Sequence, residues 1–296
     1  MTNISFFSYK GGAGRTSLLY NTLPFIAKKL GATEQEPIVV IDLDIDSKGL
    51  TYLIDRECDI NSVQVLKGEI SNNPRMACTI KDHPFFSKLL GIGEDIGLDE
   101  KHDRAVLFVP APKGRSMLGT SNIDGQNISL NKFRDICKAY GCKAIVMDTP
   151  TGNQLSGECA LSISQKIVTV MRITKQFNVG TKEFLSSSLV QGFSKKEFII
   201  LPNAVPQVPY VDGKPKYDME KIIRRIANNA KSALGTDSKN YLNLTFVENG
   251  MTGVNEVNSF KFEELNLTKE QETRVLIEDE RQAMDIYELL AKELVK

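Results

Sequence analysis

The feature that most constrains the fold is a series of short apolar runs separated by turn residues or helical patterns. Seven runs are found, at 4–8, 38–44, 105–110, 143–148, 166–171, 197–203 and 243–247. Most are continuously apolar, which is typical of strands buried on both faces of a parallel sheet. Between them, 16–30, 130–140 and 182–189 repeat apolar residues at helical spacing. This alternation predicts an α/β fold: one doubly wound domain with a mostly parallel sheet of about seven or eight strands flanked by helices.

No repeat, low-complexity tract or linker divides the chain, so residues 1–296 are predicted to form a single domain. The segment 71–103 mixes proline and glycine with charged residues and is predicted to be an irregular excursion. The segment 270–296 has one apolar and one charged face and is predicted to be a helix. Its charged face is not notably basic, so we expect it to pack on the domain or a partner rather than on a membrane.

The composition argues against several classes of protein. With 37 basic and 37 acidic side chains the formal net charge is zero, which disfavours a protein built to coat nucleic acid. The five cysteines lack the paired spacing of a disulfide framework. The sequence starts without a signal-peptide pattern, and no apolar run approaches the roughly 20 residues needed to cross a bilayer. We therefore expect a cytoplasmic protein without membrane insertion.

A glycine-rich turn follows the first apolar run and precedes the first predicted helix. Residues 8–21 read SYKGGAGRTSLLYN. The backbone N–H groups of such a turn, with a helix N-terminus behind them, form an anion site, and glycine lets the backbone wrap around a phosphate group. Thr16 stands where a hydroxyl would ligate Mg²⁺. The candidate phosphate-binding residues are Gly11, Gly12, Ala13, Gly14, Arg15, Thr16 and Ser17.

This turn departs twice from the common phosphate-loop pattern G-x-x-x-x-G-K-[ST]. Tyr9 replaces the first glycine, and Arg15 replaces the lysine. The planar guanidinium of arginine is suited to phosphate, although its reach differs from that of the compact ammonium of lysine. Binding of a triphosphate is therefore chemically feasible. Hydrolysis would depend on where Arg15 places its charge near the γ-phosphate.

The stretch KGGAGRTSLLYN resembles the deviant Walker A motif, KGGxGK[ST][ST], of the ParA/MinD family of ATPases, in a form with arginine for the second lysine. Lys10 matches the signature lysine of that family, and Asn21 matches an asparagine of its first helix. The resemblance implies a P-loop fold with ATP and Mg²⁺ as ligands. It also implies an ATP-dependent homodimer that encloses two ATP molecules, in which Lys10 acts on the phosphates bound by the other subunit.

Two further apolar runs end in aspartate. In IDLDIDSKGL, Asp42 and Asp44 match the Asp-x-Asp of the family, and in VMDTPTGN, Asp148 matches its Walker B aspartate. The resemblance implies that Asp44 orients or activates the attacking water, and that Asp42 and Asp148 lie close to Mg²⁺ together with Thr16. Residues 149–152 resemble switch II of the family. Independently of the family, carboxylates at the ends of parallel strands lie where ligands bind in open α/β sheets.

The resemblance extends over most of the chain. Residues 62–70 resemble a short helix of the family, and 107–117 resemble a strand followed by Pro-Ala. Residues 198–206 resemble the strand that ends in an adenine-contacting asparagine. Asn203 is therefore the candidate residue for reading the base, because its amide group offers both a donor and an acceptor. A role in the turn is the alternative interpretation.

Three functions remain open. The leading hypothesis is a slow, partner-stimulated ATPase that switches between monomer and dimer and recruits or positions an unidentified protein, in partition, positioning or a regulatory or defence system. The second is a nucleotide-binding module with little or no hydrolysis, which Arg15 favours. The third is an ATP-dependent metabolic enzyme on the same scaffold, a ligase or an iron–sulfur reductase, although Cys159 has no second cysteine suitably placed.

A locally basic stretch at 214–231 leaves nonspecific DNA binding open, because ParA-type proteins hold DNA through basic surface residues. Acidic residues partly offset its charge. A solvated helix face is the simpler interpretation of this stretch.

Overall fold

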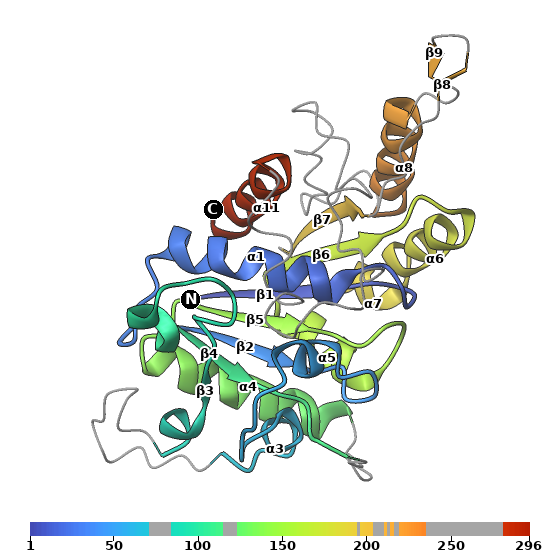
Figure 1. Ribbon diagram of the computed structural model, residues 1–296. Helices are drawn as coiled ribbons and strands as arrows, with labels where there is room; N and C mark the ends of the chain where they lie inside the picture. The colour runs from blue at the N-terminus through green and yellow to red at the C-terminus, as the bar shows by residue number, and fades with distance from the viewer. Residues whose placement is uncertain are drawn as a thin grey trace.

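The computed structural model describes residues 1–70, 84–114, 123–193, 196–203, 210–211, 214–215, 219–234 and 281–296. Within these residues, seven strands form the main sheet in the order β3-β4-β2-β5-β1-β6-β7 (Figure 1). The strands are β1 (Thr2–Phe7), β2 (Ile38–Asp42), β3 (Leu90–Gly91), β4 (Val106–Val109), β5 (Ala144–Asp148), β6 (Lys166–Met171) and β7 (Glu197–Pro202). Neighbouring strands are parallel except β3, which is antiparallel to β4.

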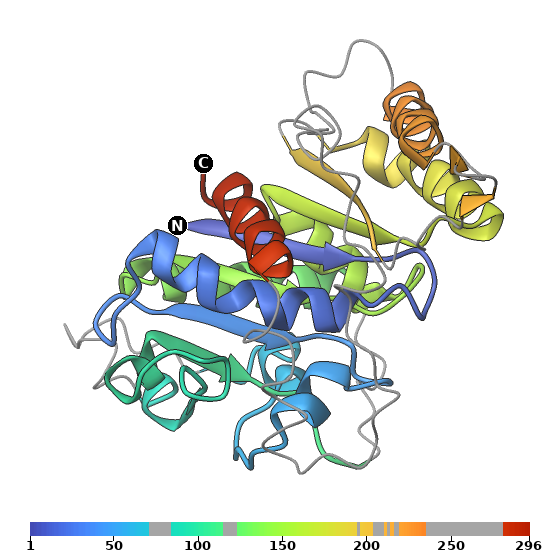
Figure 2. The same cartoon turned by 45° about the horizontal axis from the view of Figure 1, so that its top comes forward.

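Helices cover both faces of this sheet (Figure 2). The α-helices are α1 (Arg15–Leu30), α2 (Gly49–Ile54), α3 (Ser62–Leu66), α4 (Ile123–Ala139), α5 (Leu155–Ile163), α6 (Lys175–Leu185), α7 (Ser188–Gln191), α8 (Met219–Leu234) and α11 (Arg281–Val295). The shorter elements are the 3₁₀ turns η1 (Phe86–Lys88) and η2 (Glu100–Ala105) and the hairpin of β8 (Tyr210–Val211) with β9 (Lys214–Pro215). No helix of the described ranges is both long and apolar enough to span a membrane.

The strands are apolar throughout because their side chains enter a different core on each face of the sheet. In β2, Ile38 and Val40 join a core that also contains side chains of α1, α6, α8 and α11. Val39 and Ile41, which point the other way, join a core with side chains of α3, α4 and α5. All four are fully buried. Successive side chains of a strand alternate between the faces, so a strand covered on both sides must be apolar at every position.

Six of the seven predicted strands are confirmed, as β1, β2, β4, β5, β6 and β7. The seventh, 243–247, lies outside the described residues. Strand β3 was not predicted, because it has only two residues and lies within the segment expected to be irregular. The described part of that segment, 84–103, contains only η1, β3 and most of η2.

The prediction of one helix over 182–189 is wrong. Helix α6 ends at Leu185, and α7 begins at Ser188. The break falls at two serines, and the Ser187 hydroxyl accepts a hydrogen bond from the backbone N–H of Val190 as the N-cap of α7. The predicted C-terminal helix is present as α11, which packs against α1, while 270–280 lie outside the described residues.

A buried lysine connects the start of β7 to the end of α5. Lys196, just before β7, donates from Nζ to the carbonyl oxygens of Leu161, Ser162 and Ser164, at 2.9, 2.6 and 2.7 Å. These carbonyls lie at the C-terminal end of α5, where cations are favoured because the last carbonyls have no partner within the helix. Burial lowers the pKa of Lys196 to about 8. Its ammonium group therefore joins β7 to α5 at neutral pH.

Replacing Lys196 with methionine should lower the free energy of unfolding by about 2–3 kcal/mol, because three buried carbonyls lose a charged donor. Urea unfolding at pH 7 measures the change. The matched control is Lys182→Met, which removes an exposed lysine from α6 and should change stability by less than about 0.5 kcal/mol. Equal effects of the two substitutions would contradict this role for Lys196.

Candidate functional site

The loop between β1 and α1 surrounds a cavity at the carboxyl end of the sheet. Gly12 and Gly14 have φ of 80° and 76°, a conformation that glycine adopts without strain. The cavity has a volume of about 170 Å³. It is lined by Ser8, Gly11, Gly12, Ala13, Gly14, Arg15, Thr16, Ser17, Asp44, Ser47 and Thr151. Whole small-molecule sites usually enclose about 300–1,000 Å³, so this cavity suits a phosphate group rather than an entire nucleotide.

Asn203 supports the loop from the end of β7. Its Nδ2 donates to the carbonyl oxygen of Ala13 at 2.7 Å, and its backbone N–H donates to the carbonyl of Met171 at 2.8 Å. A Cβ atom on Gly14 would lie 2.4 Å from that Nδ2, so the approach of Asn203 requires glycine there. Asn203 is buried, and its amide donor is directed at the loop. The base-reading role of Asn203 stays a prediction.

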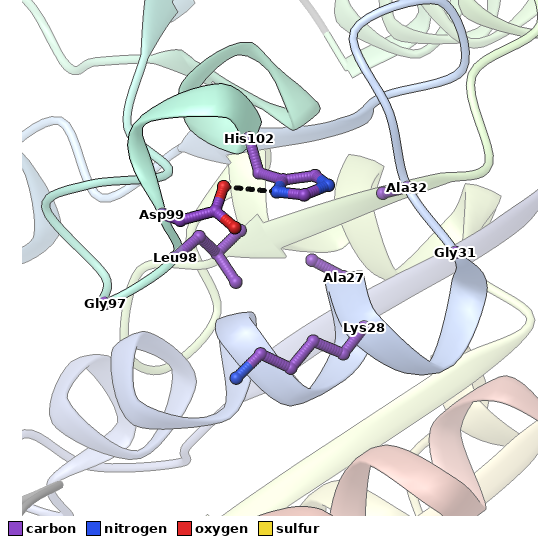
Figure 3. Close-up of a pocket in the computed structure, with 8 residues that line it drawn as sticks. All are labelled: Ala27, Lys28, Gly31, Ala32, Gly97, Leu98, Asp99 and His102. Atoms are coloured by element: carbon purple, nitrogen blue, oxygen red, sulfur yellow. Dashed lines mark hydrogen bonds and ion pairs between the residues drawn. The ribbon is translucent and has the colours of Figure 1, made fainter.

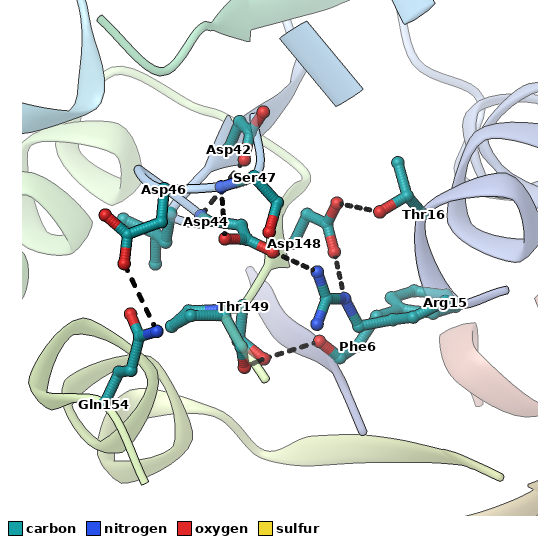
Figure 4. Close-up of polar contacts among 12 residues, drawn as sticks. Phe6, Arg15, Thr16, Asp42, Asp44, Asp46, Ser47, Asp148, Thr149 and Gln154 are labelled. Carbon is teal, nitrogen blue, oxygen red and sulfur yellow. Dashed lines mark hydrogen bonds and ion pairs between the residues drawn. The ribbon is translucent and has the colours of Figure 1, made fainter. Parts of the chain in front are cut away.

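The guanidinium of Arg15 joins two carboxylates, one at the end of β5 and one in the chain that follows β2 (Figure 4). Its Nε lies 2.5 Å from Asp148 Oδ1, and its Nη2 lies 2.9 Å from Asp44 Oδ2. The three side chains are at most 5% exposed. Thr16 Oγ1 donates to the other oxygen of Asp148 at 2.8 Å. We refer to the two contacts of Arg15 as the Arg15 bridge.

Burial and mutual charge shift the pKa values of this cluster. Burial alone would lower the pKa of Arg15, but the charges of Asp148 and Asp44 outweigh it and raise the pKa. Burial raises the pKa of Asp148 even though the charge of Arg15 opposes the shift. Burial and the charge of Asp148 also raise the pKa of Asp42 to about 7, against hydrogen bonds from Thr51. The negative charge of the three aspartates therefore exceeds the positive charge of Arg15, which favours the binding of a further cation.

Asp42 organises the chain that follows β2. Its Oδ2 accepts hydrogen bonds from the backbone N–H and the hydroxyl of Thr51, at 2.9 and 2.7 Å, and its Oδ1 accepts one from the N–H of Asp44 at 3.0 Å. Asp44 Oδ1 in turn accepts from the N–H of Ser47 at 3.1 Å. Thr51 also accepts a hydrogen bond from the N–H of Ala111. Thr51 was not predicted from the sequence, because no motif marks this position.

Lys10 lies apart from the cavity. Its Nζ donates to Gln176 Oε1 in α6 at 2.8 Å, and the contact is exposed to solvent. The neighbouring ring of Tyr9 lies directly on α6 at Gly180, where an added Cβ would be only 2.0 Å from the ring. Sequence reasoning missed this contact. No signal marked it, because Gly180 precedes the helix that was predicted over 182–189.

The residues present fit both a phosphate group and Mg²⁺. A buried nitrogen of Arg15, Nη1, and the buried hydroxyl of Ser8 have no hydrogen-bond partner among the described residues, and both residues line the cavity. Thr16, Asp148 and Asp42 supply oxygen ligands of the kind that Mg²⁺ prefers. No cluster of three or more His, Cys, Asp or Glu in the described ranges forms a self-sufficient metal site.

A second cavity of about 460 Å³ lies at the other end of α1 (Figure 3). It is formed by the last turn of α1 and the segment 97–102. The Asp99 carboxylate contacts Nδ1 of His102 at its edge, and both side chains are largely exposed. This cavity contains none of the site residues predicted from the sequence.

No family model matches the sequence, and no curated protein matches it. Solved structures do match. A ParA family ATPase from Chlorobium tepidum TLS aligns with a TM-score of 0.57 and 11% identity, over 98% of each chain. The pNOB8 ParA structure bound to nonspecific DNA aligns with a TM-score of 0.58 and 15% identity, over 99% of this chain and 97% of the other.

The septum site-determining protein MinD of Pyrococcus horikoshii OT3, in complex with Mg-ADP, aligns with a TM-score of 0.54 and 13% identity, over 100% of this chain and 96% of the other. Identities this low establish the fold alone. The chain therefore has the ParA/MinD type of P-loop fold, as the sequence predicted.

Replacing Gly180 with alanine should lower the free energy of unfolding by about 1–3 kcal/mol, because the new methyl group displaces the ring of Tyr9. Alanine would otherwise stabilise a helix by up to about 1 kcal/mol relative to glycine. Chemical denaturation measures the change, with Val179→Ala as a control at an exposed neighbour in α6. A stabilised Gly180→Ala variant would show that Tyr9 does not pack there.

Proposed function

We propose that this chain is a Mg²⁺-dependent ATPase that acts as a nucleotide-dependent dimerising switch. The proposal is carried by one observation: the glycine-rich loop, Arg15, Thr16 and Asp44 line one cavity at the carboxyl end of the sheet, and Asp148 contacts both Arg15 and Thr16. This set provides N–H donors and a cation for phosphate and carboxylates for a metal ion and a water molecule. ATPase activity in proteins of the same fold supports the choice of ATP.

Each side chain has a defined task in this proposal. Residues 11–17 hold the β- and γ-phosphates, and the freed guanidinium of Arg15 binds the γ-phosphate. Thr16 and Asp148 would hold Mg²⁺, with Asp42 behind them, and the ion would neutralise charge on the phosphate oxygens. Asp44 lines the cavity and would position the attacking water.

The switch depends on Lys10. Its ammonium group is exposed and, among the described residues, makes one hydrogen bond, to Gln176, so little free energy opposes its movement to another subunit. Contact with the γ-phosphate of a second chain would exist with ATP and disappear with ADP, which is the differential interaction that a switch requires. The homodimer would then recruit or position an unidentified protein.

The Arg15 bridge favours a second candidate, a nucleotide-binding module with little turnover. While Arg15 contacts Asp44, that carboxylate is not free to activate water. An iron–sulfur enzyme receives no such support, because Cys159 is fully buried in α5. Nonspecific DNA binding has support from α8, which places Lys221, Arg224 and Arg225 at exposed positions.

Wild-type protein should bind Mg-ATP in calorimetry and release phosphate slowly. The Asp44→Asn variant keeps the shape of the side chain but loses the carboxylate, so phosphate release should fall by about 10²-fold. Its affinity for Mg-ATP should change much less. If Asp44→Asn released phosphate as fast as wild type, Asp44 would have no role in the reaction. If wild type neither bound Mg-ATP nor released phosphate, the proposed function would be wrong.

Lys10→Ala should abolish ATP-induced dimers while leaving nucleotide binding by the monomer within about threefold of wild type, because the side chain lies outside its own cavity. Sedimentation velocity with a non-hydrolysable ATP analogue measures the dimer. Gln176→Ala is the matched control, which frees Lys10 without removing it. Normal dimers of the Lys10→Ala variant would contradict the trans contact.

A further inference from the structure

Arg15 competes with a metal ion for the carboxylates of its own site. In the Arg15 bridge, one guanidinium contacts one oxygen of Asp148 and one oxygen of Asp44. Asp148 is a ligand that Mg²⁺ would use, and its second oxygen already accepts a hydrogen bond from Thr16, the other protein ligand of the proposed metal site. The side chains of the bridge are almost completely buried. An ion entering this site must therefore displace a cation that is covalently attached to the loop.

Burial makes this competition strong. Two carboxylates without a counter-charge in a buried site carry a large desolvation cost, and the guanidinium offsets much of it. A divalent cation that arrives alone gains the carboxylates but leaves the guanidinium buried and unpaired. Breaking a buried ion pair by removing one partner is strongly unfavourable, so the exchange gains little without a new partner for Arg15.

The cavity provides a place for that new partner. Nη1 of Arg15 is buried and has no hydrogen-bond partner among the described residues. The same is true of Ser8 Oγ, and both residues line the cavity. Both groups can donate a hydrogen bond to an anion. A phosphate group in the glycine loop would therefore reach Arg15 through a donor that is already free, and would attract the guanidinium away from the carboxylates.

We propose that Arg15 is a built-in counter-cation that sets the order of binding: a phosphate group binds first and draws Arg15 away, and only then do Asp148 and its neighbours accept a divalent cation. The proposal rests on the nucleotide site proposed above and adds its regulation. Arginine suits this role because its fork contacts two carboxylates through two different nitrogens, whereas lysine offers a single point charge.

The first test measures Mn²⁺ binding without nucleotide by electron paramagnetic resonance of the free ion. Wild type should bind Mn²⁺ weakly, and Arg15→Gln should bind it at least about tenfold more tightly, because two buried carboxylates then lack a counter-charge. Lys182→Gln removes the same charge from an exposed position of α6 and should leave the Mn²⁺ affinity at the wild-type value. Equal Mn²⁺ affinity of wild type and Arg15→Gln would overturn the proposal.

Thermal unfolding with and without Mg²⁺ provides a second readout. Mg²⁺ should raise the Tm of Arg15→Gln by several degrees more than that of wild type, since a ligand that binds only the folded state stabilises it. If Arg15→Gln does not fold, Arg15→Lys takes its place, and its Mn²⁺ affinity should still exceed that of wild type. Mn²⁺ affinity of Arg15→Lys at or below the wild-type value would then reject the counter-cation role.

Calorimetry of wild type in EDTA separates this proposal from the function itself. ATP without metal should bind measurably, because phosphate comes first in the proposed order. Binding of Mn²⁺ alone together with failure of metal-free ATP to bind would reverse the order and overturn the inference. If Mg-ATP also fails to bind, the proposed function fails, and the Mn²⁺ comparison of the variants still tests the Arg15 bridge independently.

Discussion

The register of the parallel strands is the constraint on which the site depends. Phe6 at the end of β1 and Asp42 at the end of β2 are both paired in register with Asp148 of β5. The glycine loop and the two aspartates therefore leave the sheet at the same level. A one-residue shift would move each side chain of a strand to the opposite face, and the loop and the two aspartates would no longer lie side by side. The apolar strands resist such a shift, because both faces are packed with helices.

The site that results is built on charges that are not fully balanced. Three aspartates and one arginine lie within a buried cluster, and the pKa values of Asp42 and Asp148 are raised by burial. Such an arrangement favours additional positive charge, which a metal ion would supply together with a bound phosphate group in the proposed function. Arginine in place of the lysine of related loops changes how this preference is satisfied, because its fork can join two carboxylates at once.

Contacts behind the loop give it a defined shape. Asn203 holds the carbonyl of Ala13 from the end of β7, and Tyr9 packs on Gly180 of α6. The loop is thus supported by elements distant in the sequence. Tyr9 and Lys10, two neighbouring residues of the loop, both contact α6, so the loop and this helix lie directly against each other.

The sequence by itself determined the strand–helix alternation, the glycine-rich loop after β1 and the aspartates that end β2 and β5, because these follow from local periodicity and from motifs of fixed spacing. It did not determine β3, the break between α6 and α7, or the roles of Thr51 and Gly180. Two-residue pairing and contacts between distant segments leave no periodic signal. Only the tertiary structure decided where Arg15 points, because its direction depends on carboxylates that lie 29 and 133 residues away along the chain.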